Sequence, residues 1–278
     1  MKKIDKDNDV KQLANRIRKN ILYMSYKAGS SSAHIGGALS IADILAALFA
    51  KKISYDSLDP LSKDRDRFIL SKGHACLAYY SVLHEIKYLS KDDMDTFEKN
   101  ESFLLGHPVM NKKYGIEFST GSLGMGLSLG IGVSISAIKK KKKFQVYVIL
   151  GDGECNEGSI WESAMFAPNN NLSNLNVIID RNNFQQTGEN KNIMDLRNLS
   201  DKWKSFGFSV REVDGHNVPA LESCINELPF KSGRPSAIIC HTVKGRGFEF
   251  AEGRPEWHHK SRFNIEDIDR IYAALKDN

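Results

Sequence analysis

QVYVILGDGECNEG, residues 145–158, decides the fold, because an uninterrupted apolar run leads directly into a glycine-rich turn. A strand that is apolar at every position is covered on both faces, which is typical of a parallel sheet. NVIIDRNN, residues 176–183, repeats this pattern after an intervening helical stretch. Strand, helix and strand at a spacing of about thirty residues predict a βαβ unit.

The rest of the chain extends this pattern in both directions. Further strands are expected at 68–70, within 205–216 and within 235–247. Helices are expected over 10–28, 41–49, from the turn after 70 to about 89, 121–140, 159–166 and 219–228. The tail from Gly247 is expected to form a loop closed by a short helix over 265–275. We therefore predict an α/β fold with one doubly wound, mainly parallel sheet that is covered by helices.

Two finer features of these helices can also be predicted. The residues from Ser40 to Asp43 and from Ser159 to Glu162 match helix capping boxes. The helix over 121–140 contains small residues at three- and four-residue spacing, which indicates close backbone packing rather than flexibility.

Composition excludes several classes of protein. The chain has 278 residues, of which 41% are hydrophobic and 26% charged, so that a sizeable core can form. A net charge of +5 is too small to indicate a nucleic-acid partner, no segment is apolar enough to span a membrane, and the charged N-terminus lacks a signal-peptide pattern. The four cysteines lie far apart without a CxxC pair, which argues against a zinc site or disulfides and favours a reducing cytoplasm.

Each of the two apolar runs quoted above is followed closely by a polar residue. Asp152 follows the first apolar run and Asn182 the second. A right-handed crossover brings both strand ends to the same edge of the sheet, where ligands bind in open α/β folds. Two oxygen ligands suit Mg²⁺ or Ca²⁺, and Mg²⁺ usually completes its coordination with water and phosphate. Gly151 and Gly153 allow the backbone to approach a phosphate closely.

These two stretches together resemble the thiamine diphosphate signature, in which GDG is followed about thirty residues later by Asn. GDGECNEGSIWESAMFA, residues 151–167, is similar to transketolases rather than to other thiamine enzymes. Further matches are AHIGG, DRFILSKGHA, LGHP, STGSLGMGLSLGIG, EVDGH and KGRGFEFAEGRPEWHHK. The resemblance covers nearly the whole chain. It implies that residues 1–278 form the family's first domain, the thiamine diphosphate-binding fold that holds the diphosphate.

The resemblance also implies what the protein does and what it lacks. The pyrimidine-binding and C-terminal domains of transketolases have no room in 278 residues, so the chain resembles the N-terminal subunit of a split enzyme. Such an enzyme is a transferase that moves a two-carbon ketol unit from a ketose to an aldose by means of thiamine diphosphate. The expected partner is a separate chain with the missing domains, including the glutamate that activates the cofactor, in an α2β2 heterotetramer.

Roles for individual residues follow from the resemblance. Asp152, Asn182 and the carbonyl of Phe184 would hold the metal, and His74 and His258 would touch the diphosphate and the reacting sugar. His34 and His107 would line the substrate funnel, donate hydrogen bonds to sugar hydroxyls and assist proton transfers. The remaining cofactor contacts would come from Gly121, Leu123, Gly151, Gly153 and Glu154. Glu157 would join a carboxylate network across the dimer interface, for which Glu162 is a further candidate, whereas His84, His216 and His241 are expected to be structural.

The sequence departs from the family pattern at a few of these positions. Transketolases usually have SGHPGG where this chain has SSAHIGG, so that Ile35 replaces a proline next to His34. They usually have Gly after the histidine of the last motif, where this chain has His259, which leaves open whether His258 or His259 is the site residue. Gln186 and Thr187 stand where the family often has Ile or Asp. These departures leave the sugar preference open.

Three other functions remain open at this point. One is a transketolase-like enzyme of natural-product or surface-sugar synthesis with an unusual acceptor. A second is another thiamine enzyme, such as the α-subunit of a 2-oxoacid dehydrogenase or deoxyxylulose-phosphate synthase, against which the segment NEGSIWESAM argues. The third is a non-catalytic paralogue, which the intact Asp152, Asn182, His74 and His258 disfavour.

Overall fold

The computed structural model describes residues 9–29, 31, 33–186, 188–259 and 264–276. Its strands are β1 (Arg67–Leu70), β2 (Val146–Gly151), β3 (Leu175–Arg181), β4 (Phe184–Gln185), β5 (Gly188–Glu189), β6 (Ser209–Asp214) and β7 (Ser236–His241). Its α-helices are α1 (Val10–Ala28), α2 (Gly36–Leu39), α3 (Ala42–Ala47), α4 (Cys76–Glu85), α5 (Lys91–Met94), α6 (Met125–Lys139), α7 (Gly158–Asn169), α8 (Asn190–Ile193), α9 (Leu199–Phe206), α10 (Val218–Asn226) and α11 (Ile265–Lys276). Shorter turns of 3₁₀- or π-helix are η1 (Leu48–Lys52), η2 (Gly73–Ala75), η3 (Lys112–Tyr114), η4 (Gly153–Asn156) and η5 (Pro255–Trp257).

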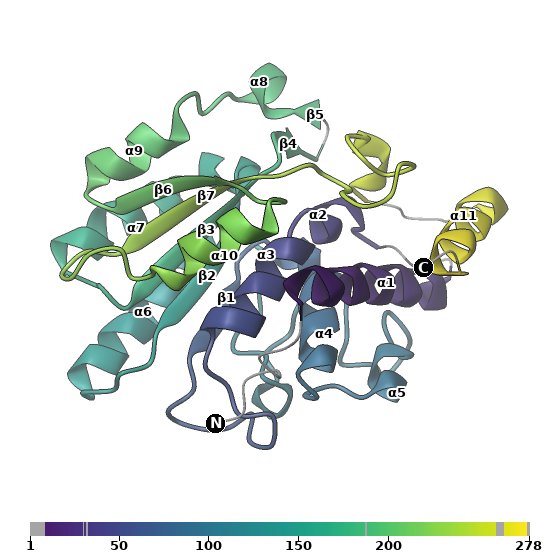
Figure 1. Cartoon of the computed structure of the whole chain (residues 1–278), viewed down its shortest axis with the longest axis horizontal. Coiled ribbons are helices and arrows are strands. Elements are labelled where there is room, and N and C mark those ends of the chain that lie inside the picture. The colour runs from purple at the N-terminus through teal and green to yellow at the C-terminus, as the bar shows by residue number, and fades with distance from the viewer. Residues whose placement is uncertain (1–8, 30, 32, 187, 260–263, 277–278) are drawn as a thin grey trace.

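Five strands form one sheet in the order β1-β2-β3-β7-β6, and every neighbouring pair is parallel. Helices cover both faces of this sheet (Figure 1). The expected parallel α/β architecture is therefore confirmed. The two short strands β4 and β5 form a separate antiparallel hairpin beyond the end of β3.

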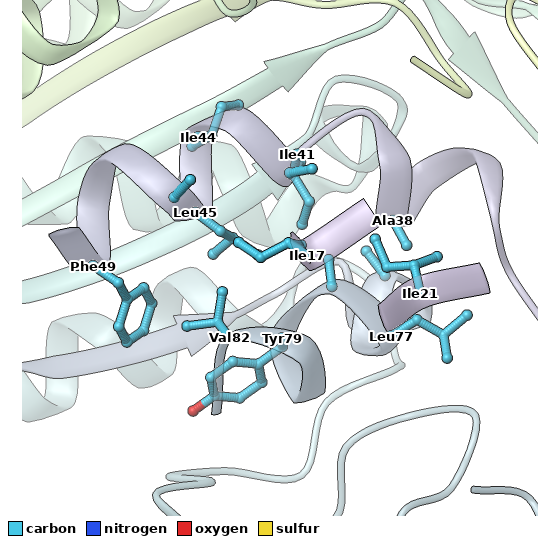
Figure 2. Packing of buried hydrophobic residues seen from close by; sticks show 14 of the residues in the cluster. Ile17, Ile21, Ala38, Ile41, Ile44, Leu45, Phe49, Leu77, Tyr79 and Val82 are labelled. Carbon is cyan, nitrogen blue, oxygen red and sulfur yellow. The ribbon is translucent and has the colours of Figure 1, made fainter. Parts of the chain in front are cut away.

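Alternate residues of each central strand pack on opposite faces of the sheet, as the two-residue period of a strand requires. In β3, Ile178 joins the core beneath α1, α3, α4 and α10, whereas Val177 and Ile179 join the core beneath α6, α7 and α9. Figure 2 shows the first of these cores, where Ile17 and Ile21 of α1 lie among apolar side chains of α2, α3 and α4. Because both faces are covered, the middle residues of the central strands are apolar on both sides, as in residues 177–179 of β3.

The longest helix, α1, lies where its sequence pattern predicts. Asp9 caps its N-terminus by accepting a hydrogen bond from the backbone of Lys11 at 2.9 Å, and Gly29 ends it with a φ of 62°. Helix α11 lies beside the C-terminal end of α1, where the rings of Tyr26 and Tyr272 are 6.0 Å apart (Figure 1). The predicted tail helix is thus present, while residues 260–263 of the tail lie outside the described part of the chain.

Both predicted capping boxes are wrong. The N-cap of α3 is Ile41, and that of α7 is Glu157, with no side-chain cap at either position. The two serine hydroxyls are used elsewhere: Ser40 donates to a carboxylate oxygen of Asp180 at 2.7 Å, and Ser159 donates to the carbonyl of Gly124 at 3.0 Å. Tertiary hydrogen bonds to distant segments have replaced the local caps.

Helix α6 packs against the sheet through its glycines, as predicted. A Cβ atom at Gly126 would lie 2.4 Å from the Cβ of Ser71, and one at Gly130 would lie 2.6 Å from a methyl group of Val148. Gly132, on the outer side of the helix, has no atom within 4 Å of such a position. None of the helices within the described ranges has the length and apolar character needed to cross a membrane.

Gly130 and Gly132 make a matched pair for a stability test, because only Gly130 packs against the sheet. Alanine in place of glycine in a helix stabilises by about 1 kcal/mol, but overpacking a core costs about 1–3 kcal/mol. We expect Gly132→Ala to leave the free energy of unfolding unchanged or higher, and Gly130→Ala to lower it. Urea unfolding of both variants measures this, and equal stabilities would contradict the close packing of α6.

Candidate functional site

Four strand ends meet around one cavity of about 310 Å³ at the carboxyl edge of the sheet. The segments that follow β1, β2, β3 and β7 each supply lining residues, and loops from the N-terminal third, from 105–124 and from the tail complete it. The lining residues are His34, Gly37, Lys72, His74, His107, Gly121, Leu123, Gly151, Asp152, Gly153, Glu154, Asn156, Glu157, Asn182, Phe184, Gln185, Gln186, Lys244 and His258. Every residue predicted as a metal ligand, a cofactor contact or a catalytic group lies in this set.

Asp152 and Asn182 come together as their spacing predicts, because β2 and β3 are adjacent and parallel. One oxygen of Asp152 accepts from the backbone of Gly153 at 2.8 Å, and the other accepts from that of Asn183 at 2.7 Å. Burial, and then the negative charge of Asp180, raise the pKa of Asp152 to about 6. The carboxylate therefore lies in a place where a nearby cation would stabilise its charge.

Among the described residues, no three side chains of His, Cys, Asp or Glu are grouped as metal ligands. A cation at this edge would need other oxygen ligands in addition to Asp152. Asn182 and Phe184 lie in the same cavity, where the backbone N–H of Phe184 donates to the amide oxygen of Asn182 at 3.0 Å. Such a mixed set of oxygens, completed by phosphate, is what Mg²⁺ usually takes.

Asp180, at the end of β3, connects the strand ends. Its carboxylate accepts hydrogen bonds from Ser40 at 2.7 Å and from the amide nitrogen of Asn182 at 2.9 Å, and also from Lys72 and Thr242. The ammonium group of Lys72 forms an ion pair with it, which lowers the pKa of Asp180 despite complete burial. The amide nitrogen of Asn182 is held by its hydrogen bond to Asp180. The amide oxygen of Asn182 is therefore the atom that can face a cation beside Asp152.

Lys244, which follows β7, is buried with only 1% of its surface exposed. Its nitrogen lies 5.7 Å from the centre of the Phe184 ring, and it forms no ion pair with any described residue. Burial, and then the charge of Lys72, lower the pKa of Lys244 to about 8. A buried ammonium group without a counter-ion is an anion-binding feature of the cavity. Neither Lys72 nor Lys244 was predicted as a site residue, although they lie inside the quoted motifs SKGHA and KGRG.

Glu154 lies at the cavity, but its carboxylate is already committed to other groups. It accepts hydrogen bonds from the backbone of Gly124 at 2.9 Å and of Gly151 at 3.0 Å, and from the hydroxyl of Ser71. The side chain therefore joins the segments after β1 and β2 to the start of α6. Its contribution to the cavity is structural support for the glycine-rich turn.

Five histidines gather on one side of the cavity. The ring centroid of His34 lies 5.5 Å from that of His74, 5.5 Å from His107, 5.6 Å from His258 and 4.4 Å from His259. Burial is the largest cause that lowers the pKa of His34 and His258, each to about 3, and it lowers those of His74 and His107 as well. These four imidazoles are therefore neutral at pH 7, so that each offers one N–H donor and one nitrogen acceptor.

The structure distinguishes the two adjacent histidines of the tail. His258 lines the cavity and is half-buried, whereas His259 is exposed and lies outside the lining. The three histidines expected to be structural have partners elsewhere: His84 lies 3.0 Å from the carbonyl of Leu89, His216 lies 2.7 Å from Asp43, and His241 lies 2.8 Å from Glu212.

The other predicted residues divide between the cavity and the surface. Gly121 presses against His107, because a Cβ atom there would lie 2.9 Å from the ring, and Leu123 adds an exposed apolar side chain beside it. Glu157 is an exposed residue of the cavity lining. Glu162 borders a different surface hollow, together with residues of α7 and α9, and Thr187 lies outside the described residues.

Several buried polar atoms of the cavity have no partner within the described part of the chain. They are the side-chain oxygen of Asn156, the amide nitrogen of Gln185 and Nδ1 of His258. Buried polar groups are nearly always hydrogen-bonded in native proteins, so these atoms indicate a polar ligand. Together with Lys244, Asp152 and the glycine-rich turn, they fit a cation bound to a phosphorylated group.

The sequence matches the family model described as transketolase, thiamine diphosphate binding domain, over residues 10–275. The chain belongs to the transketolase family. The resemblance found in its motifs is thereby confirmed, and so are the transferase class and the thiamine diphosphate-binding fold.

Relatives of similar length cover almost the whole chain. One of them, a subunit of the apulose-4-phosphate transketolase of Actinobacillus succinogenes, is 38% identical over 270 residues, which are 97% of this chain and 96% of that protein. The 6-deoxy-6-sulfo-D-fructose transketolase subunit SqwG of a Clostridium species is 38% identical over 251 residues, which are 90% of each chain. The prediction that the chain is part of a split transketolase, and not of another thiamine enzyme, is supported by both.

Solved transketolases show the same fold in a longer chain. The transketolase of Leishmania mexicana matches with a TM-score of 0.87 and 28% identity, over 96% of this chain and 41% of that one. Human transketolase is 36% identical over 96% of this chain and 42% of its own length. The chain thus spans about two fifths of these longer transketolases.

The buried Lys244 predicts a stability difference that depends on pH. Because the pKa of Lys244 is lowered to about 8 in the folded chain, the unfolded chain binds more protons between pH 8 and the ordinary value of 10.5, and the contribution of this residue to stability rises with pH across that window. At pH 7 the buried charge is unfavourable, so we expect Lys244→Met to raise the free energy of unfolding by roughly 2 kcal/mol.

The stability gained in Lys244→Met should shrink as the pH rises from 8 to 10.5, because the folded wild-type chain progressively loses the buried charge. Urea unfolding of both proteins at a series of pH values measures the difference, with exposed Lys143→Met as the control. A gain that is independent of pH would show that apolar packing, and not the buried charge, is responsible.

Proposed function

We propose that this chain is the diphosphate-binding subunit of a two-chain transketolase, which moves a two-carbon ketol unit from a ketose to an aldose. The observation that carries the proposal is one cavity that combines oxygen ligands, Asp152 and Asn182, with buried cations, Lys72 and Lys244. This cavity occurs in a chain that covers 96% of a relative named as part of a split transketolase.

The metal is Mg²⁺ or Ca²⁺, held by Asp152, by the amide oxygen of Asn182 and by the carbonyl of Phe184. A divalent cation would give the buried carboxylate of Asp152 a counter-charge in direct contact, since Lys72 acts on it only without an ion pair. On the anionic side, Lys244 neutralises diphosphate charge. The turn at Gly151 and Gly153 lets phosphate oxygens approach the backbone, and it is packed so closely that a Cβ atom at Gly153 would lie 2.8 Å from that of Gln185.

Thiamine diphosphate, when bound, supplies the carbanion chemistry of ketol transfer. The protein orients the sugar and moves protons. As neutral imidazoles, His34 and His107 donate hydrogen bonds to sugar hydroxyls, and His74 and His258 contact the diphosphate and the reacting sugar. Negative charge placed beside these rings raises their pKa values toward neutrality, which suits proton transfer to and from sugar oxygens.

The partner is a separate chain with the pyrimidine-binding and C-terminal domains, which supplies the glutamate that activates the cofactor. Glu157 stands on the exposed rim of the cavity, where such a chain would close the site, and two copies of each chain form an α2β2 assembly. The four cysteines are unpaired, which fits a cytoplasmic enzyme.

The substrates are sugars with an anionic group. Two of the relatives at 38% identity are named for apulose 4-phosphate and for 6-deoxy-6-sulfo-D-fructose, so that a phosphate and a sulfonate sugar are equally compatible with this chain. A transketolase-like enzyme of natural-product or surface-sugar synthesis with an unusual acceptor is therefore the second candidate. The intact cavity disfavours a non-catalytic paralogue.

The metal assignment can be tested by Asp152→Ala. Removal of the carboxylate should abolish Mg²⁺-dependent binding of thiamine diphosphate and leave the fold intact, because the side chain sits at a strand end and not in the apolar core. Isothermal titration calorimetry of the two-chain complex measures the affinity, with Asp269→Ala on α11 as the exposed control. Wild-type affinity in Asp152→Ala would remove this residue from the site.

Dependence on the partner can be tested by reconstitution. The purified chain alone should show no ketol transfer from xylulose 5-phosphate to ribose 5-phosphate, since the activating glutamate is supplied in trans. The chain encoded beside it, if it has a pyrimidine-binding domain, should restore turnover when added, with these sugars or with a sulfonated donor. Robust activity of the single chain would be incompatible with the split-enzyme proposal.

A further inference from the structure

The ring of His34 lies at the centre of the histidine cluster without a hydrogen bond to hold it. Four imidazoles surround it with centroids at 4.4–5.6 Å, and neither of its nitrogens has a hydrogen-bond partner among the described residues. Contacts between rings, and not a hydrogen bond to a described residue, therefore support the orientation of His34. A long-lived orientation matters, because His34 lines the cavity.

His259 makes the shortest of these ring contacts. Its centroid lies 4.4 Å from that of His34 with the planes inclined at 41°, whereas the other three rings are at 5.5 Å or more. His259 is exposed and does not line the cavity, so this contact joins a cavity histidine to one outside the lining.

The segment that carries His259 is firmly attached to the loop that carries His34. Trp257, two residues earlier, is 2% exposed, and its ring lies 4.8 Å from that of Phe250. Its carbonyl lies close to Gly36, where a Cβ atom would be only 3.0 Å away, and the backbone of Gly245 donates to the carbonyl of Gly36 at 3.0 Å. The backbone that leads to His259 is thus packed directly against the loop that carries His34.

Two departures from the transketolase pattern meet at this contact. The residue after His34 is Ile35 in place of the usual proline, so a ring no longer restricts the backbone there. On the opposite side, His259 replaces the usual glycine and adds an imidazole against His34. Ile35 thus removes a restriction on the backbone beside His34, and His259 adds a ring contact to its side chain.

We propose that His259 is a positioning residue, which holds the His34 imidazole toward the cavity through the contact between their rings. The His34 ring is neutral, because burial, and then repulsion from His259, lower the pKa of His34 to about 3. An aromatic side chain without a charge can therefore replace His259, whereas a flexible polar chain cannot.

Nuclear magnetic resonance of the full chain, labelled at histidine, tests this without substrate or partner. The variants are His259→Gln and His259→Phe, with exposed His241→Gln as the matched control, and His34→Gln assigns the signals. In His259→Gln, the nuclear Overhauser effects between His34 and the rings of His74 and His258 should fall to about half or less, because a free imidazole populates several rotamers. His259→Phe should restore them. Unchanged effects in His259→Gln would overturn the proposal.

The kinetic consequence rests on the proposed function and is measured in the two-chain enzyme. Loss of a defined orientation for His34 should lower kcat/KM for ketol transfer by about tenfold in His259→Gln, with recovery in His259→Phe and an unchanged Kd for thiamine diphosphate. Equal rates in both variants and the wild type would also overturn the proposal. A wild-type complex without ketol transfer would instead contradict the proposed function, and the spectra would still decide the role of His259.

Discussion

One buried carboxylate holds the carboxyl edge of the sheet together. Asp180 has no exposed surface, and its donors come from the turn before α3, from the segment after β1, from the segment after β3 and from the end of β7. Its ion pair with Lys72 is almost completely desolvated, and removal of one partner of such a pair costs about 3–5 kcal/mol. The relative placement of the strand ends, and hence the shape of the cavity, depends on this network.

The same network explains which charges the fold leaves without partners. Lys72 forms an ion pair with Asp180, but Lys244 and Asp152 form none with a described residue, and burial moves the pKa of each toward its neutral form. The cation and diphosphate of the proposed site would bring charge of the opposite sign to both side chains at once. The site is therefore electrostatically incomplete in the free chain, in a way that one ligand can correct.

Much of this arrangement could be predicted from the sequence, because it follows from strand order and periodicity. The convergence of Asp152 with Asn182 needs only two parallel strands and a crossover, and the glycine packing of α6 needs only spacing. Contacts between remote segments could not be predicted in this way. Ser40 matched a local cap but bonds 140 residues away, and Lys72 finds its partner 108 residues away.

The strand order also constrains how the chain is made. Strand β7 lies between β3 and β6, although it follows both in the sequence, so β6 has no partner in the sheet until residue 241 has been synthesised. Helices α1, α3 and α4 leave the ribosome even earlier, before β2, β3 and β7, the strands whose face they cover (Figure 1). The contacts of α1 with α2, α3 and α4 in Figure 2 can form before these strands exist, but the side of the helices that packs on the sheet must stay uncovered until the strands are made. This late burial makes the nascent N-terminal third a natural client of chaperones.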